Sequence, residues 1–185
     1  MAWAASASAY RVCNVYLEPD GPGGDAPPST HGGCYLSDPE AEAAAATAQA
    51  TDNLTKAIPR RWVKIGLDCE AGLQEICAFA DKLWWWGKDG RCDHNTRYRD
   101  RYIGDDWNDR VVGAQGRGGC NRFIHFEHRG FDSDWISCGH STDWYSGETP
   151  PQSLSCNTLG PLTKETSSER WLRCPDRNRL CFRSR

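Results

Sequence analysis

Ten cysteines in a chain of 185 residues constrain this fold more than any other feature of the sequence. Four of them recur at intervals of 18 residues: Cys120, Cys138, Cys156 and Cys174. Three of these four close similar phrases, at 134–138, 152–156 and 170–174. Because alternate residues of a β-strand share one face, the apolar residue and the cysteine of each phrase point the same way. We therefore expect three strand ends, each pinned by a disulfide.

The cysteines also indicate a compartment. None of them forms a CxxC pair, the close spacing typical of zinc ligands. So many thiols would be unusual in a reducing cytosol, so we expect disulfides and a secreted, extracellular protein. The disulfide pairing does not follow from the spacing.

The domain organisation is predicted to be simple. Residues 1–9 are interpreted as a leader remnant with an alanine-rich end. The rest, 10–185, is expected to form a single disulfide-rich domain, with an alternative sub-boundary near Pro59.

One helix and many short strands are predicted. Ser37 or Asp38 caps the helix and Pro39 suits its first position. The alanines up to residue 50 favour a helix from about 38 to 50, which can continue to Lys56. Expected strands are 10–17, 62–67, 76–79, 82–86, 110–114, 122–127, 135–138, 154–156 and 171–174, and expected loops are 20–33, 87–106 and 139–152. The prediction is a mainly β (α+β) fold: a disulfide-pinned antiparallel sandwich or barrel with one Ala-rich N-terminal helix.

Part of the C-terminal half resembles a known family. The segments 107–113, 119–131 and 162–171 resemble the Greek-key units of βγ-crystallins, whose loops carry paired acids and hydroxyls before a strand. The resemblance implies a secreted domain, and secreted microbial members include protease inhibitors and antimicrobial or killer toxins. The first loop has Val112 and Gly113 where the calcium-binding loops carry hydroxyls, and the second has Thr163 and Lys164 in place of acids. We therefore do not predict calcium binding.

A second resemblance favours an enzyme. Residues 35–38 with the alanine-rich helix, then 109–112 and 123–125, resemble small secreted guanyl-type ribonucleases of fungi. This resemblance implies that Arg110 stabilises the charge of the phosphorane and that His125 protonates the leaving oxygen. No motif supplies the base carboxylate or a second histidine before Arg110. A secreted ribonuclease-like enzyme that acts on RNA stays an alternative function.

Nine tryptophans are many for this length, and three of them are consecutive. If Trp84, Trp85 and Trp86 form a strand, at least one indole is expected to point outward. Exposed aromatic planes bind sugars, stack on bases or anchor protein interfaces. The three residues are our candidate binding residues, with a carbohydrate-binding domain as an alternative function. The other interpretation is that they fill a core.

The histidines do not predict a metal site, because His125 and His128 of one strand face opposite sides. Glu127 shares the face of His125, so we expect a His125–Glu127 pair and a candidate face formed by Arg110, His125 and Glu127. We expect no metal, no cofactor and no membrane span.

The leading hypothesis for the function is a secreted non-enzymatic binding protein, a toxin, effector or inhibitor, that acts on a protein or glycan target outside the producing cell. The oligomeric state is not predicted.

Overall fold

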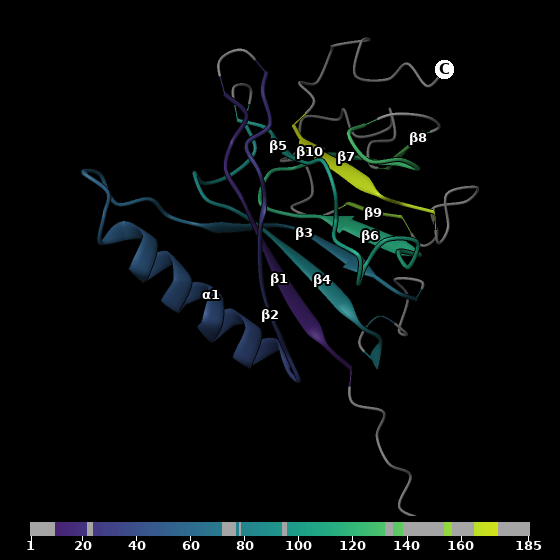
Figure 1. Ribbon diagram of the computed structural model, residues 1–185, viewed down its shortest axis with the longest axis horizontal. Coiled ribbons are helices and arrows are strands. Elements are labelled where there is room, and N and C mark those ends of the chain that lie inside the picture. The colour runs from purple at the N-terminus through teal and green to yellow at the C-terminus, as the bar shows by residue number, and fades with distance from the viewer. Residues whose placement is uncertain are drawn as a thin grey trace, which may run out of the picture.

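Two β-sheets and one α-helix form the described part of the chain (Figure 1). The computed structural model describes residues 10–21, 24–71, 77, 79–93, 96–131, 135–138, 154–156 and 165–173. For 135–138 and 154–156 only the backbone is described. The expected loop 139–152 lies outside these residues, and so do residues 76 and 78 of the expected strand 76–79, whose described residues 77 and 79 lie in a helical turn.

The larger sheet has six strands in the order β2-β1-β4-β3-β6-β9. Its strands are β1 (Val12–Leu17), β2 (Thr30–Tyr35), β3 (Val63–Cys69), β4 (Lys82–Gly87), β6 (Gly113–Gly116) and β9 (Leu154–Cys156). All neighbours are antiparallel except β1 and β4, which are parallel. This parallel pair departs from the antiparallel arrangement that we expected. It is possible because a hairpin, a helix and a further strand separate β1 from β4 along the chain, which is long enough for a crossover.

The smaller sheet has four antiparallel strands in the order β5-β10-β7-β8. They are β5 (Tyr98–Asp100), β10 (Ser168–Leu172), β7 (Arg122–Phe126) and β8 (Trp135–Cys138). Strand β10 occupies the middle of the described sheet and pairs with strands that precede it by about 40 to 70 residues. Long-range pairings of this kind are invisible to local sequence patterns.

Helix α1 (Asp38–Asn53) covers the side of the larger sheet that faces away from the smaller one (Figure 1). The side chain of Ser37 caps it by accepting a hydrogen bond from the Glu40 amide, and a proline lies in the first turn. Ala41 and Ala45 are its buried residues. Because alanine is small, the helix can approach closely and pack on the side chains of β1, β3 and β4.

The main core lies between the two sheets. Trp171 of β10 stacks on Phe123 of β7 with ring centroids 5.1 Å apart, and it meets Trp85 of β4 at 5.9 Å. All three side chains are completely buried. Since each indole or phenyl ring buries a large apolar area, this contact holds the layers together. The predicted disulfide-pinned, mainly β fold is confirmed, and its two sheets form a sandwich.

Three disulfides are described: Cys13–Cys34, Cys69–Cys77 and Cys92–Cys120. Strands β8 and β9 end at Cys138 and Cys156, as the 18-residue spacing predicts. Strand β10 ends at Leu172, two residues before Cys174. The expected disulfides at Cys138, Cys156 and Cys174 involve side chains that lie outside the described part of the chain.

Two expected loops contain strands. Strand β2 falls at the end of the expected loop 20–33, where pairing with β1 and the Cys13–Cys34 bridge override the glycines. Strand β5 lies in the expected loop 87–106 and forms the edge of the smaller sheet. Strand β6 begins at Gly113 and not at Arg110, because residues 105–110 form turns. No helix within the described residues is long and apolar enough to cross a membrane.

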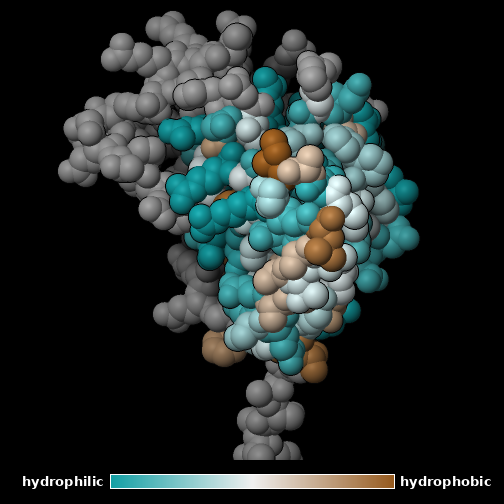
Figure 2. Space-filling model, turned by 90° about the vertical axis from the view of Figure 1, so that its left-hand side faces the viewer, coloured by the Kyte–Doolittle hydropathy of each residue, from teal (hydrophilic) through white to brown (hydrophobic). Residues whose placement is uncertain are grey.

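The surface on the helix side is largely polar. Figure 2 shows hydrophobic residues at separate places on an otherwise hydrophilic and neutral face. The exposed large hydrophobic residues of the described chain are Leu36, Leu54, Ile58 and Phe79. Single exposed apolar residues of this kind are normal on a protein surface and do not by themselves indicate a binding site.

Candidate functional site

The three consecutive tryptophans lie in packed interiors. Both faces of β4 are covered, so Trp84 packs toward α1 and Trp85 toward the smaller sheet. Trp84 and Trp85 are buried, and Trp86 is half-buried against the helix side. Two of the indole N–H groups are hydrogen-bonded: Trp85 Nε1 donates to Asp68 Oδ2 at 2.6 Å and Trp86 Nε1 donates to Asn14 Oδ1 at 3.0 Å. The burial of Trp84 and Trp85 agrees with the other interpretation, that these residues fill a core, because helix and sheet cover both faces of the strand.

Arg110 belongs to an ion-pair network at the ends of the central strands β1, β3 and β4 of the larger sheet. It donates to Glu70 Oε2 at 2.6 Å and to Asp81 Oδ2 at 3.2 Å. Arg11 binds the same Asp81 through its amide at 2.7 Å and its guanidinium. Burial alone would raise the pKa of Asp81, but the hydrogen bonds from Arg11 and Arg110 outweigh it and lower that pKa. These contacts anchor Arg110 in the fold.

His125 lies in the core between the two sheets. Its side chain is completely buried, and its Nε2 lies 3.3 Å from Asp68 Oδ1 and 3.2 Å from Glu169 Oε1. Burial alone would lower the pKa of His125, but the two carboxylates raise it to about 10. Burial, together with the neighbouring Asp68, raises the pKa of Glu169 well above its usual range. Both partners of His125 differ from the expected one, Glu127.

Glu127 lies instead at an open, polar pocket of about 660 Å³. The pocket is lined by Asn108, Asp109, Glu127, His128, Arg129, Glu165 and Ser167. The Ser167 hydroxyl donates to Asn108 Oδ1 at 2.6 Å, so the two loops that resemble each other in sequence lie side by side. Arg110, His125 and Glu127 thus occupy three different settings, an ion-pair network, a core and a pocket, and do not form the common face that we expected.

A cluster of arginines on the outer side of the smaller sheet forms a different candidate site. We call it the arginine face, and it comprises Arg97, Arg99, Arg101, Arg170 and Phe131. Arg99 and Arg170 are directly opposed on neighbouring strands. The guanidinium groups of Arg99, Arg101 and Arg170 lie 5.4, 5.6 and 4.4 Å from the ring centroid of Phe131. The arrangement combines positive charge with an aromatic plane.

The electrostatics of the arginine face favour an anionic ligand. Burial and the neighbouring Arg99, Arg101 and Arg97 lower the pKa of Arg170, against an opposing effect of Asp20. Arg99 donates its Nε to Asp20 at 2.8 Å. Among the described residues, the Nη2 of Arg99 and the Nε of Arg170 have no hydrogen-bond partner. Both of these atoms are buried, whereas Arg97 and Arg101 are exposed, and exposed guanidinium groups can bind sulfate, phosphate or carboxylate oxygens.

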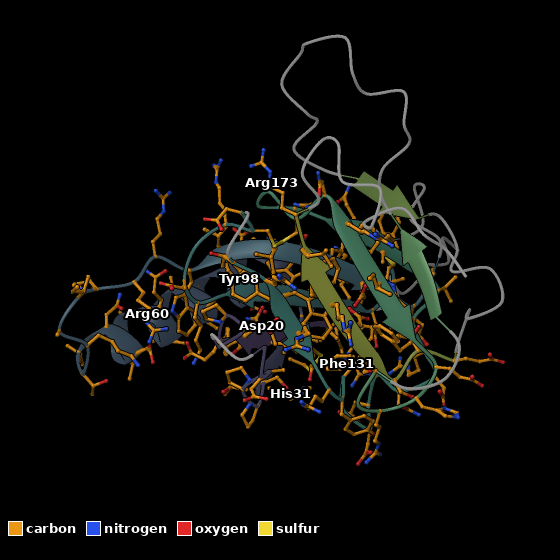
Figure 3. The ribbon with its side chains drawn as sticks, turned by 90° about the horizontal axis from the view of Figure 1, so that it is seen from above. Asp20, His31, Arg60, Tyr98, Phe131 and Arg173 are labelled. Atoms are coloured by element: carbon orange, nitrogen blue, oxygen red, sulfur yellow. A yellow bond between two sulfur atoms is a disulfide. The ribbon has the colours of Figure 1, made fainter. Side chains whose placement is uncertain are left out.

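Phe131 is held in an unusual conformation at this face. Its backbone φ is +70°, in the left-handed region that bulky residues rarely adopt. The Phe131 amide donates to Ser168 Oγ of β10 at 3.1 Å, and the Gly130 amide donates to the Arg101 carbonyl at 2.9 Å. Figure 3, which looks onto the smaller sheet, shows Phe131 and Asp20 beside β10. Strain of this kind is concentrated at functional sites.

Sequence reasoning missed the arginine face, although one signal was present. The run Arg97-Tyr98-Arg99-Asp100-Arg101 alternates arginine with residues that the structure buries, the period of a strand with one basic face. The partners Arg170 and Phe131 come from distant segments that no local pattern connects. Comparison with known proteins adds no relative: no family model, no curated protein and no solved structure matches this chain.

Proposed function

We propose that this chain is a secreted, non-enzymatic binding protein, a toxin, effector or inhibitor, that recognises an anionic surface on its target through the arginine face. The observation that carries the proposal is the direct opposition of Arg99 and Arg170 on neighbouring strands. Like charges directly opposite one another destabilise a sheet. An anionic partner would reduce this cost, because it adds to the counter-charge that Asp20 provides.

Secretion forms part of the proposal and rests on the cysteines. Three disulfides connect segments of both sheets and their loops. Disulfides persist in oxidising compartments outside the cytosol. Targets there include cell surfaces rich in sulfated, phosphorylated or carboxylated groups, which suit bidentate guanidinium recognition.

The test is binding of fluorescently labelled protein to intact bacterial, fungal and animal cells. We expect binding to at least one cell type, competition by a soluble sulfated polysaccharide, and inhibition of growth at the same protein concentrations. The double variant Arg101→Gln/Arg170→Gln should lose binding and inhibition together. The matched control is Arg117→Gln, since Arg117 is exposed, lies in the turn after β6 and donates its Nε and Nη2 to Gln115 Oε1.

Two results would contradict the proposal. The first is equal cell binding by the double variant and the wild type. The second is cleavage of a labelled RNA by the folded protein that is lost in His125→Ala, because it would make the ribonuclease-like alternative the function. The comparison of cell binding requires that the double variant is folded, which near-ultraviolet circular dichroism verifies.

A further inference from the structure

Asp68, His125 and Glu169 form a closed group in the interior. Their ligand atoms all lie within 4.8 Å of one another. Asp68 lies on β3 of the larger sheet, whereas His125 on β7 and Glu169 on β10 are directly opposed partners in the smaller sheet. Their side chains are at most 1% exposed. The group therefore bridges the two sheets at a buried position.

The surrounding protein does not meet the hydrogen-bonding needs of this group. The Nε2 of His125 is close to one oxygen of each carboxylate, but a single N–H can be donated to only one of them. The Glu169 Oε1 forms an ion pair with His125 Nε2, but within the described part of the chain Oε2 has no hydrogen-bond partner. A buried carboxylate oxygen without a partner is costly. The Glu169 carboxylate, aimed at His125 Nε2 from 3.2 Å, therefore indicates a missing ligand.

We propose that Asp68, His125 and Glu169 bind a divalent metal ion, Zn²⁺ by the chemistry of the donors, between the two sheets. Imidazole nitrogen and carboxylate oxygen bind zinc at about 2.0–2.2 Å, and tetrahedral ligands at such lengths lie about 3.3 Å apart. The separations of His125 Nε2 from Asp68 Oδ1 and Glu169 Oε1, 3.3 Å and 3.2 Å, agree with this value. Two carboxylates and one neutral imidazole also balance the double positive charge of the ion.

The neighbours of the group suit a metal site. The Trp85 Nε1 donates to Asp68 Oδ2 at 2.6 Å, which fixes the carboxylate and leaves Oδ1 turned toward His125. Hydrogen bonds of this kind orient metal ligands. Phe123 and Trp171 flank the imidazole with ring centroids 5.8 and 6.4 Å away. In such apolar surroundings the ion would act structurally and join the two sheets, because its ligands come from both of them.

The test uses metal-stripped protein refolded with and without zinc chloride. We expect one bound zinc per chain by elemental analysis, and a melting temperature that rises with zinc and falls when a chelator is added. The isosteric variant Glu169→Gln should lose both the bound zinc and the zinc-dependent shift. The control variant His128→Asn should keep both, because His128 is exposed, lies three residues from His125 and is absent from the group.

Folded wild-type protein that holds no zinc after refolding in zinc chloride would overturn the proposal. Zinc retained equally by Glu169→Gln would overturn it too. If that variant does not fold, cobalt replaces it as the probe in the wild-type protein. Tetrahedral Co²⁺ with nitrogen and oxygen ligands gives visible absorption bands, and a spectrum without such bands at saturating Co²⁺ would contradict the site.

Discussion

Phe131 shows at the scale of one residue how the arginine face is built. Its left-handed backbone costs about 1–2 kcal/mol for a residue with a Cβ atom. The ring gains contact with three guanidinium groups in return. The hydrogen bond to Ser168 fixes the turn against β10. The strained backbone conformation of Phe131 therefore places its aromatic ring among the arginines at a cost in folding free energy.

We predict that Phe131→Gly is more stable than Phe131→Ala by about 1 kcal/mol, because both variants lose the ring and only glycine is relieved of the backbone strain. Urea unfolding of the two variants measures the difference. At an ordinary φ glycine is the less stable of the two, so an alanine variant more stable than the glycine variant would show that the turn is not strained.

Asp81 gives a prediction about pH. Its pKa is lowered in the fold, so its stabilising effect is present above the unfolded pKa of about 3.9 and is lost as the pH falls through the folded value. We expect Asp81→Asn to lower the free energy of unfolding by about 1–3 kcal/mol at neutral pH and by much less at about pH 2. Urea unfolding at both pH values tests this, with Asp25→Asn, an exposed carboxylate, as control. An equal loss at both pH values would contradict the assignment.

At the scale of the element, β10 serves both faces of the smaller sheet. Arg170 points to the arginine face, while Glu169 and Trp171 on either side of it point into the core. The indole of Trp171 packs directly on the backbone of β3 at Gly66. A Cβ atom built at Gly66 would lie only 2.4–2.7 Å from this indole, so no side chain fits there.

We predict that Gly66→Ala destabilises the protein by about 1–3 kcal/mol, the usual cost of overpacking a core. The second substitution Trp171→Leu should recover part of this loss, so that the two effects are not additive. Gly21→Ala is the control, since a Cβ atom there makes an ordinary contact of 3.7 Å. Denaturant unfolding of the single and double variants measures the coupling. Strict additivity would show that Trp171 does not press on Gly66.

At the scale of the whole molecule, the sequence predicts the elements that depend on neighbouring residues and does not predict the contacts between segments that are far apart in the chain. Helix α1 and strands β4, β7, β8 and β9 follow from local signals such as the alanine run and the short apolar phrases. The burial of Trp84 and Trp85 did not follow, because it depends on both the helix and the second sheet covering β4. The same holds for Asp68 and Glu169, which reach His125 from other strands, one of them in the other sheet.

The three described disulfides should stabilise the molecule in the order of the loops they close. The sequence separations are 28 residues for Cys92–Cys120, 21 for Cys13–Cys34 and 8 for Cys69–Cys77. Loop-closure entropy predicts losses of about 3–4 kcal/mol for each of the two longer bridges and about 2–3 kcal/mol for the shortest when both cysteines become alanine. Denaturant unfolding of the three double variants checks this order. The largest loss in the variant without Cys69–Cys77 would contradict it.

The measurement that tests the central claim most directly is the salt dependence of binding to a sulfated polysaccharide such as heparin. Each arginine that contacts an anionic group adds about one to the steepness of log K against log salt. We expect the slope of Arg101→Gln/Arg170→Gln to be shallower than that of the wild type by about two, and that of Arg117→Gln to be unchanged. Equal slopes for the wild type and the double variant, or no binding by the wild type, would contradict an anion-binding arginine face.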